Sequence, residues 1–548
     1  MNPGRLAALT SLAVLASCFT ACSSSVDVSF NLINPCQEDL FGTMGCQLIE
    51  VEVSALDPAD PLYPGREVEG LGPLRGTCDI GDGQCSISDE ELVGDGRVVD
   101  VRCYLSLETE AVARATSSAL KFESGGGGAG GKTLNLLFGN VNGFVDTTVL
   151  DPGDDLGTCS KLGITRNQGR FGHTATLLDD GRVLIAGGVI RLGQGVTVYL
   201  DTAEIYDPLT GQHSVLLDSS GDAAKMTASR AFHTATRLRD GRVLIAGGVG
   251  RIDDVATALR SAEIFDPTRD IFVPSGDADS LSTPTDMGAP RAHHCATLLA
   301  TGEALLTGGA VYTTGSLSTY LNTAKLFNPD SNAWSDVTAN MSTARAFHQA
   351  VLLDPATTQG KVLVVGGENA DGTLDSIDIY NPNDKGFFAG VNVSMSRARS
   401  RFCATRLQNG EVLVAGGTTT AGDFTPDSSV EIFSLMLEGK PYGGFKPDVI
   451  NLEVGRMDHS CNLLETGNVV VAGGRLAGGV ATSVGELVLI GSNTYTVSRL
   501  SDSLDPPRFQ HTATQLESGW ILLAGGLPNS DPNTMGEMQS QLFVPRPR

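Results

Sequence analysis

A pair of adjacent glycines recurs along most of the chain, at intervals of 50 to 61 residues. Each pair follows a short apolar run such as Val183–Ala186. A period near 50 residues is typical of architectures in which each unit buries its apolar face against its neighbours. The 548 residues are therefore predicted to form a repeat array rather than several independent domains. The seven pairs are Gly187-Gly188, Gly247-Gly248, Gly308-Gly309, Gly366-Gly367, Gly416-Gly417, Gly473-Gly474 and Gly525-Gly526.

A histidine precedes most of these pairs by 14 residues, and this position is termed the histidine slot. In the fourth repeat the slot lies 18 residues before its pair because the turn over residues 354–360 is longer, and in the fifth repeat Phe402 occupies it. An arginine lies three residues before every slot. The slot histidines are His173, His233, His294, His348, His459 and His511; the arginines are Arg170, Arg230, Arg291, Arg345, Arg399, Arg456 and Arg508.

The segment from slot to glycine pair predicts a β-hairpin, because in the second repeat two apolar runs flank Asp240-Gly241. A third strand follows after a variable loop, and a weaker fourth is clearest at Trp334–Val337. The third strands are expected at Ala203–Tyr206, Ala262–Phe265, Ala324–Phe327, Ile377–Tyr380, Val430–Phe433, Gly485–Val488 and Ser540–Phe543. Four antiparallel strands repeated seven times predict an all-β chain whose residues 151–548 form a seven-bladed β-propeller.

The glycine pairs and the Asn-Ala-Trp sequence of residues 332–334 resemble kelch repeats. The Asp-Gly-Arg-Val-Leu-Ile-Ala-Gly-Gly stretches are most similar to those of bacterial kelch lipoproteins and of the galactose oxidase propeller, over residues 160–548. The resemblance implies a kelch-type propeller. It implies little about function, because propellers carry many functions.

Two further parts of the chain complete the predicted fold. The last repeat ends soon after its third strand, and Cys159–Ile164 is expected to supply its fourth, since the ring would otherwise keep an open edge. Residues 26–150 are predicted to form a small β-sandwich-like domain. Its alternating runs are Val26–Ile33, Cys46–Val53, Arg97–Leu107 and Thr133–Phe138.

The first residues have the pattern of an export signal. Arg5 precedes an apolar run over residues 6–16, which is too short to span a membrane. The sequence ending at Cys18 resembles a bacterial lipobox, and Cys22 is a second candidate for lipidation; a plain secretory signal is the alternative. Residues 1–17 are thus a predicted signal peptide and 18–25 a tether. No Asp follows either cysteine, which indicates the outer membrane of a Gram-negative bacterium, facing the periplasm or the cell surface.

Between the two candidate lipidation cysteines and the repeats the chain has six more, and an exported chain is expected to form disulfides among them. They are Cys36, Cys46, Cys78, Cys85, Cys103 and Cys159. Their pairing is open, since six cysteines allow 15 connectivities. The short loop favours Cys78 with Cys85, whose spacing suits zinc poorly.

The recurring polar residues are interpreted as structural. The slot histidines are expected to be buried and bonded to the backbone of a neighbouring blade, rather than to ligate a metal, because Phe402 can replace one. The slot arginines either pair with Glu204, Glu263, Asp378, Glu431 and Glu486 on the third strands, or are solvated; Lys325 and Gln541 break this pattern. Cys295, Cys403 and Cys461, near the slots, are interpreted as buried thiols rather than part of a copper-radical site. No metal or cofactor is predicted.

The formal net charge of −25 argues against nucleic-acid binding. The longest and most variable loops follow second strands or connect blades, so they lie on one face of the predicted propeller, where binding residues gather. The candidates there are Arg191, Tyr199, Arg251, Tyr312, Tyr320, Asp423 and Arg475. The sequence therefore predicts a lipid-anchored binding or scaffold module for a protein or glycan, not an enzyme. The alternatives are a carbohydrate-active or copper-dependent oxidase-like enzyme, and a structural cell-envelope component.

Overall fold

The computed structural model describes residues 169–545 with short gaps, together with strands between residues 26 and 146. The gaps are 192–195, 209–210, 218–222, 253–254, 275–286, 314–315, 422–423, 438–439, 448–449, 492–493, 532–533, 535 and 537–539. The predicted signal peptide, the tether and both candidate lipidation cysteines lie outside the described residues. Within the described residues, no helix is long and apolar enough to cross a membrane.

The chain is all-β, as predicted, and counted over the described residues it contains seven sheets built on one plan. In each sheet the strands follow the order first, second, third, fourth, and neighbouring strands are antiparallel. The first sheet contains β13 (Thr174–Leu177), β14 (Val183–Ala186), β17 (Ala203–Asp207) and β18 (Gln212–Val215). The second contains β19 (Thr234–Arg237), β20 (Val243–Ala246), β23 (Ala262–Asp266) and β24 (Ile271–Pro274). The third contains β25 (Cys295–Leu298), β26 (Ala304–Thr307), β29 (Ala324–Asn328) and β30 (Ala333–Asp336).

The next three sheets repeat this order. The fourth sheet contains β31 (Gln349–Leu352), β32 (Val362–Val365), β35 (Ile377–Asn381) and β36 (Gly386–Phe387). The fifth contains β37 (Cys403–Arg406), β38 (Val412–Ala415), β39 (Ser429–Ser434) and β40 (Gly444–Phe445), and β41 (Ile450–Asn451) also pairs with β39. The sixth contains β42 (Ser460–Leu463), β43 (Val469–Ala472), β44 (Val484–Ile490) and β45 (Tyr495–Ser503). A short helix, α2 (Pro355–Thr358), occupies the longer turn predicted in the fourth repeat.

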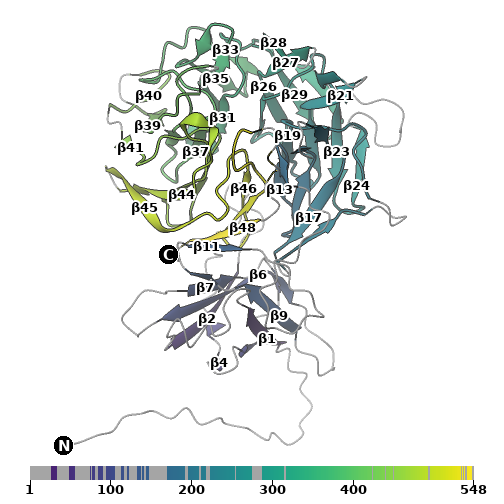
Figure 1. Ribbon diagram of the computed structural model, residues 1–548, viewed down its shortest axis with the longest axis vertical. Helices are drawn as coiled ribbons and strands as arrows, with labels where there is room; N and C mark the ends of the chain where they lie inside the picture. The colour runs from purple at the N-terminus through teal and green to yellow at the C-terminus, as the bar shows by residue number, and fades with distance from the viewer. Residues whose placement is uncertain are drawn as a thin grey trace, which may run out of the picture.

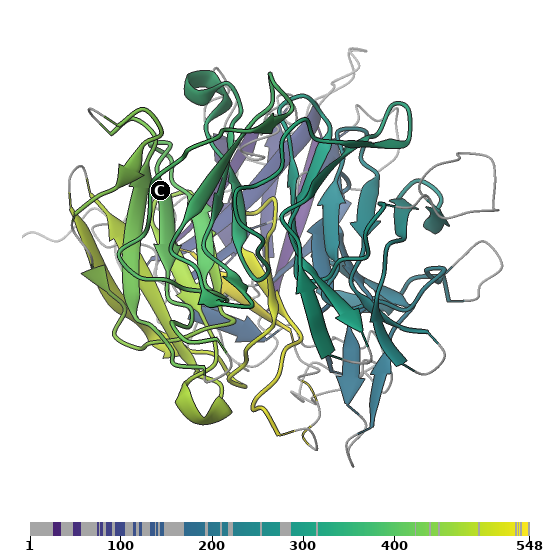
Figure 2. The same ribbon diagram turned by 90° about the horizontal axis from the view of Figure 1, so that it is seen from above.

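The first strands of the sheets form a closed ring. Each contacts the next, and the last, β46 (Thr512–Gln515), contacts β13. β13, β19, β31, β37 and β46 lie near the centre of the upper lobe, with β24, β40 and β45 towards its edge (Figure 1). Seen from above, the sheets follow one another in chain order, from teal through green to yellow (Figure 2). This is the arrangement of a β-propeller, and the sheets are its blades.

The last blade is completed by a strand from the N-terminal side. It contains β46, β47 (Ile521–Ala524), β48 (Gln541–Val544) and β11 (Gly143–Asp146), which pairs antiparallel with β48. The two strands meet where the lobes join (Figure 1). The prediction that the N-terminal side closes the blade is correct, but its position is wrong: residues 143–146 fill the edge, and Cys159–Ile164 lies outside the described residues. The shift has a simple reason, since any alternating segment before the first blade can pair with β48.

Two sheets precede the propeller. One orders β4 (Thr77–Asp79), β5 (Gln84–Asp89), β1 (Val26–Ile33) and β9 (Lys132–Leu137), with β1 and β9 parallel. The other contains β10 (Gly139–Asn140), β7 (Ala113–Thr116), β6 (Gly94–Tyr104), β2 (Leu48–Ala55) and β3 (Leu74–Arg75), with β8 (Leu120–Phe122) on β6. The register places Cys78 opposite Cys85 on β4 and β5. Their disulfide and the sandwich packing stay predictions.

The hydrophobic core lies between blades. All four residues of every second strand are buried. Leu184 and Phe265 belong to one buried cluster shared by the first two blades, and similar clusters join later neighbours. Each blade therefore depends on the next for its burial, as in other repeat proteins.

The slot arginines tie each blade together and attach it to the one before. The Arg230 guanidinium, fully buried, donates to the Gly247 carbonyl at 2.9 Å and pairs with Glu263. Its backbone carbonyl accepts from Gly188 N–H of the preceding blade at 2.8 Å. The same blade-to-blade bond recurs around the ring, including Gly526 to Arg170 at 2.9 Å. The alternative of solvated arginines is therefore wrong. Carboxylate pairing is found in five blades: Arg170–Glu204, Arg230–Glu263, Arg345–Asp378, Arg399–Glu431 and Arg456–Glu486.

The glycine pair is required by this close approach. Gly187 has φ of 63°, and an added Cβ would lie 2.4 Å from the Arg230 carbonyl oxygen. Gly188 has φ of 99°, where its Cβ would lie 2.9 Å from that of His173. A side chain at either place would be strained and would push the blades apart.

The slot histidines bond between blades through side chains. His233 Nε2 is hydrogen bonded to Thr174 of the preceding blade at 2.9 Å, and His173 closes the ring on Thr512 at 3.0 Å. Burial, and then nearby Arg170, lowers the pKa of His173 to about 3. The structural interpretation holds in that these imidazoles are buried and bond a neighbouring blade. Hydroxyl groups are partners that the prediction did not include, whereas a hydrogen bond with the Ala524 backbone of the last blade, which the prediction did include, also acts on the pKa of His173.

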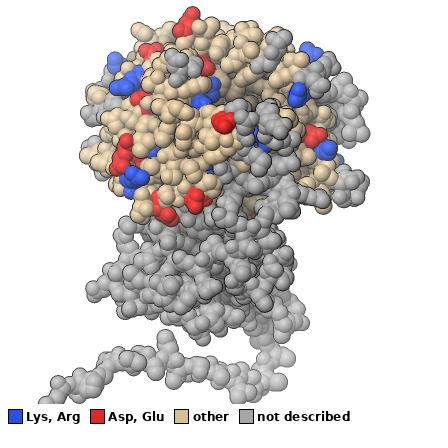
Figure 3. All heavy atoms as spheres, viewed as in Figure 1, with Lys and Arg blue, Asp and Glu red and all other residues tan. Residues whose placement is uncertain are grey.

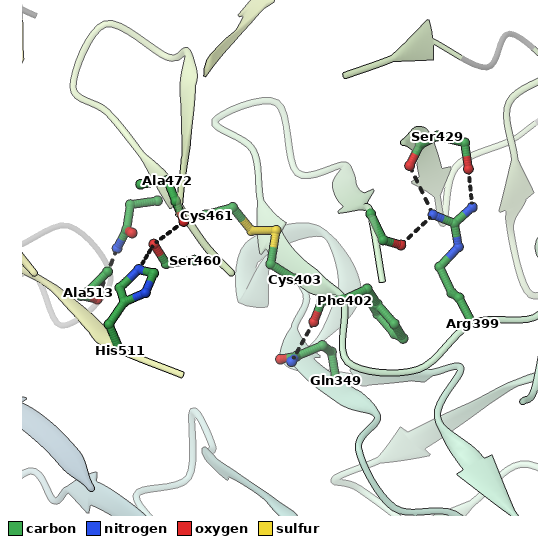
Figure 4. The surroundings of a disulfide bond; sticks show 12 residues. Gln349, Arg399, Phe402, Cys403, Ser429, Ser460, Cys461, Ala472, His511 and Ala513 are labelled. Atoms are coloured by element: carbon green, nitrogen blue, oxygen red, sulfur yellow. Dashed lines mark hydrogen bonds between the residues drawn. A yellow bond between two sulfur atoms is a disulfide. The ribbon is translucent and has the colours of Figure 1, made fainter. Parts of the chain in front are cut away.

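Two of the three cysteines near the slots are joined. Cys403 on β37 and Cys461 on β42 form a disulfide across neighbouring blades, with their Cα atoms 5.8 Å apart (Figure 4). The prediction of free thiols is therefore wrong for this pair. Sequence spacing hid it, because 58 residues separate the two cysteines. Cys295 is a free thiol that donates to the His348 carbonyl at 2.9 Å.

Candidate functional site

The residue directly before each histidine slot lies at the propeller axis, and these residues are termed the axial ring. Its members are Gly172, Phe232, His293, Phe347, Arg401, Asp458 and Gln510. Each N–H donates to the carbonyl of the previous member, from Phe232 to Gly172 at 2.7 Å onward to Gln510 and Asp458 at 3.0 Å. Six backbone hydrogen bonds thus connect the seven members.

All members of the axial ring have positive φ, between 52° and 62°. This left-handed conformation is unfavourable for residues other than glycine, by roughly 1–2 kcal/mol each. It recurs in every blade, so the propeller itself imposes it by burying the arginine and histidine on either side. The backbone is therefore constant while the side chain is free to differ. Binding sites are commonly built in this way, from variable side chains on a backbone that a rigid scaffold holds in place.

One side of the axial ring is aromatic, and Phe171, Phe232, His293 and Phe347 are termed the aromatic arc. The His293 ring stacks on Phe347 with centroids 4.0 Å apart and lies 4.6 Å from Phe232. Phe171 meets Phe232 edge-on at 6.3 Å. Tyr312 of β27 (Ala310–Thr313) completes the arc through a 2.8 Å hydrogen bond to His293 Nε2.

The other side is charged, and Glu368, Arg401, Asp458 and Arg475 are termed the charged arc. The two guanidiniums approach Asp458 from opposite sides, at 3.7 Å for Arg401 and 3.5 Å for Arg475. Arg401 also lies 3.9 Å from Glu368, which accepts from Ser400 at 2.6 Å. The side chains of Arg401, Asp458 and Arg475 keep 14%, 10% and 11% of their exposure, so solvent still reaches them.

The titratable groups of the aromatic arc are uncharged near neutral pH. Burial, reinforced by Arg401, lowers the pKa of His293 well below its ordinary value. Burial also raises the pKa of Tyr312 to about 12. Burial lowers the pKa of Arg475, an effect that Asp458 opposes. The site therefore combines an apolar, neutral half with a half that carries fixed charges.

Loop length differs between the two halves. Strand pairs extend the loops after the second strands of the first four blades: β15 (Val189–Arg191) with β16 (Thr197–Tyr199), β21 (Val249–Ile252) with β22 (Val255–Ala258), β27 with β28 (Ser316–Tyr320), and β33 (Glu368–Asn369) with β34 (Gly372–Thr373). β12 (Arg170–Phe171) joins the first pair. In the fifth and sixth blades only single bridges take this place among the described residues. The aromatic arc is thus walled by hairpins, whereas the charged arc is more open.

The structure brings most of the predicted binding residues to this face. Tyr312 and Arg475 belong to the site itself, and Tyr199 packs beside Phe171 and Phe509. Arg191 lies over the Phe171 ring at 5.1 Å and donates to the Asp531 carbonyl at 2.8 Å.

The remaining predicted residues lie further out. Tyr320 interacts electrostatically with Glu368 and Arg401. Arg251 is exposed and reaches the Thr197 carbonyl at 3.4 Å. Asp423 lies outside the described residues.

Sequence reasoning missed the axial ring itself. The signal was present: the position before the slot holds Gly, Phe, His, Phe, Arg, Asp or Gln, while the arginine and the slot beside it hardly change. Phe424, which contacts both guanidiniums, had no such signal because it lies within a variable loop.

The copper-radical alternative fits these side chains poorly. Cys403 and Cys461 are bonded to each other, so neither sulfur is available to cross-link a tyrosine. Across the part of the chain that the structure describes, no group of three or more His, Cys, Asp or Glu side chains is placed to hold a metal ion.

Comparison with known proteins adds a likeness of fold only. No protein-family model and no curated protein matches the sequence. A fungal alcohol oxidase of the AA5 family, solved in complex with copper, is similar with a TM-score of 0.49 and 15% identity, over 69% of this chain and 74% of its own. YjhT is similar with a TM-score of 0.43 and 15% identity, over 60% of this chain and 97% of its own. Likenesses this distant carry no functional argument.

Proposed function

We propose that this protein is an exported, lipid-anchored binding module that holds a partner protein at the axial ring. The observation that supports it most is the arrangement at the axis: the fixed backbone of the axial ring presents aromatic rings on one side and Arg401 on the other, where Arg475 joins it beside Asp458. Aromatic residues and arginine are the types that contribute most to binding at protein interfaces. The export signal and lipobox-like sequence before residue 23 support the anchored location.

A protein partner suits the aromatic arc better than a glycan. His293 and Tyr312 bond each other, and the other side chains of the arc are phenylalanines. Sugar hydroxyls buried there would lose hydrogen bonds to water without replacement, which is costly. On the face of the propeller shown in Figure 3, acidic and basic residues are interspersed and form no large patch of one sign.

The first test is capture of partners from a cell-envelope extract, with two site variants and a control. Phe347→Ala removes an aromatic face, and Arg401→Gln removes one guanidinium. Arg269→Gln is the control, because Arg269 is 58% exposed and pairs with Asp266 of its own turn. We expect the same proteins to be retained by wild type and control, and lost with both site variants.

Three outcomes would contradict the proposal. Retention that both site variants leave unchanged would place binding elsewhere. Binding on a glycan array that the site variants abolish, with no protein retained, would favour the glycan alternative. Stoichiometric copper in chelator-free protein would favour the oxidase alternative, for which the described residues offer no supporting contact.

A further inference from the structure

Three polar atoms of the charged arc have no hydrogen-bond partner although they are buried. They are Nε of Arg401, Nε of Arg475 and Oδ2 of Asp458. The ion-pair distances among these groups, 3.5–3.7 Å, are longer than hydrogen bonds. Nε of buried slot arginines such as Arg230 is also unpaired, but there the rest of the guanidinium is fully bonded inside the blade. In the charged arc, unpaired donors and an unpaired acceptor lie together on side chains that solvent reaches, which indicates where polar atoms of another molecule belong.

The two guanidiniums are held in place by aromatic faces. Arg401 lies 3.7 Å above the Phe347 ring, and Arg475 lies 4.0 Å above that of Phe424. Phe424 also lies within 5.4 Å of Arg401, and Phe509 within 5.3 Å of Arg475. Stacking of this kind orients a guanidinium before a ligand arrives and reduces the entropy lost on binding. Two oriented arginines form a clamp suited to a carboxylate.

The unpaired atoms define what the ligand must carry. Arg401 and Arg475 offer donors, so they require an anion. Asp458 offers an acceptor at the same place, so the anion must have an N–H or O–H beside it; a bare carboxylate would be repelled. The aromatic arc next to the clamp can pack against the flat ring of a ligand. That ring needs no hydrogen-bonding group, since His293 and Tyr312 are hydrogen bonded to each other.

We propose that the axial ring recognises the C-terminal aromatic residue of a polypeptide. Its carboxylate lies between Arg401 and Arg475, its amide N–H donates to Asp458, and its ring packs against the edges of the stacked Phe347 and His293 rings. A C-terminal residue supplies these three groups together, and capture of a terminal carboxylate is an established mode of peptide recognition. This inference rests on the proposed function and names the chemical group through which the partner is held.

The test is titration calorimetry of the purified full chain with three small probes. N-acetyl-phenylalanine carries the ring, the amide N–H and the carboxylate; 3-phenylpropanoate lacks the N–H; N-acetyl-phenylalaninamide lacks the charge. We expect N-acetyl-phenylalanine to bind about tenfold more tightly than its amide, the effect of a charge-assisted hydrogen bond. Arg401→Gln and Arg475→Gln should remove that difference, whereas Arg269→Gln should keep it.

Asp458→Asn gives a second, independent readout. This variant should bind N-acetyl-phenylalanine more weakly than wild type does. It should bind 3-phenylpropanoate equally or more tightly, since only N-acetyl-phenylalanine has an amide N–H that donates to the Asp458 carboxylate. Arg401→Lys, which keeps the charge, replaces Arg401→Gln if the latter does not show wild-type unfolding. Equal binding of N-acetyl-phenylalanine and its amide would overturn the inference.

The free amino-acid derivative and a protein C-terminus share this chemistry, and a pentapeptide ending in phenylalanine distinguishes them. We expect the peptide to bind at least as tightly as the derivative; clearly weaker binding would overturn the assignment to polypeptides. If no probe binds while the site variants still abolish partner capture, this inference fails and the proposed function stands. If capture is also unaffected, both fail.

Discussion

At the scale of single residues, the histidine slot shows which part of a repeat is essential. Phe402 occupies the slot with its ring 2.7 Å from the place of a Cβ on Gly366, and His459 occupies it in the same way against Gly416, at 2.6 Å. His459 Nε2 contacts no hydroxyl among the described side chains, unlike that of His233. A flat ring is therefore what the slot requires. The hydrogen bond is an addition made in some blades.

This difference predicts how the slots respond to substitution and to pH. His233→Phe should cost about 1 kcal/mol at pH 7.5, because Thr174 loses its partner. His459→Phe should leave the free energy of unfolding nearly unchanged at pH 7.5. Burial lowers the pKa of His459 to about 3, below the ordinary 6.5. Between pH 6.5 and pH 3 this histidine is protonated in the unfolded chain but not in the folded chain. The free energy of unfolding of wild type therefore falls by up to about 1.4 kcal/mol per pH unit at this group. His459→Phe should therefore gain stability over wild type as the pH falls from 6.5 to 4. Thermal unfolding at several pH values measures this, and a constant difference would contradict it.

At the scale of elements, the joints between blades are alike but not identical. Most joints use an imidazole and a hydroxyl, as where His511 meets Ser460 at 2.9 Å. The joint of β37 with β42 uses the Cys403–Cys461 disulfide instead (Figure 4). These blades carry Arg401 and Asp458, two members of the charged arc. The covalent link therefore lies beside the pair of charges whose relative position the proposed carboxylate clamp needs.

Loss of this disulfide should weaken the propeller. Cys403→Ser should lower the free energy of unfolding by about 2–4 kcal/mol, the usual effect of removing a native disulfide. Reductant should lower the melting temperature of wild type more than that of Cys403→Ser, since both chains keep the disulfides predicted before the propeller and only wild type has the Cys403–Cys461 link to lose. Cys295→Ser is the matched control, since Cys295 is a free thiol in a comparable place, and should respond to reductant as wild type does. Equal melting temperatures of wild type with and without reductant would show that the link does not stabilise the fold.

At the scale of the whole molecule, ring closure joins the two lobes. β11 is the outer strand of the last blade, and it directly follows β10 of an N-terminal sheet. β11 also contacts β45 of the sixth blade. The propeller is thus closed by a segment that the domain boundary predicted at residue 150 assigned to the N-terminal domain. The two lobes are expected to unfold together.

Proline substitutions in β11 test this closure in the full chain. In an antiparallel pair only alternate residues exchange hydrogen bonds, so one of Phe144→Pro and Val145→Pro removes bonds to β48 and the other does not. The disruptive variant should lose roughly 1–3 kcal/mol. It should also self-associate, because the freed edge of β48 can pair with another chain. Thermal unfolding and gel filtration measure the two effects, and wild-type behaviour of both variants would show that β11 is dispensable.

The strand plan of the propeller could be predicted from sequence because its signals are local. Third strands expected at Ala203–Tyr206 and Ala262–Phe265 extend by a single residue in the structure. The glycine pair, the arginine and the slot lie within 18 residues of one another in six of the seven repeats, and each repeats. Copies of a short pattern identify a blade before any long-range contact is known. The binding face followed from the same plan, since alternate loops of antiparallel strands lie on the same side.

Which side chains meet depends on how the blades pack in three dimensions. Local sequence patterns are enough to predict the blades, their framework and the face with long loops. The axial ring, the Cys403–Cys461 disulfide and the closing strand β11 each join residues dozens to hundreds of positions apart, with 339 between His173 and Thr512. No local periodicity encodes such contacts, because they arise when neighbouring blades pack and bring one residue from each to the axis. The repeats fix where those residues stand, and their chemistry becomes a site only once the ring has closed.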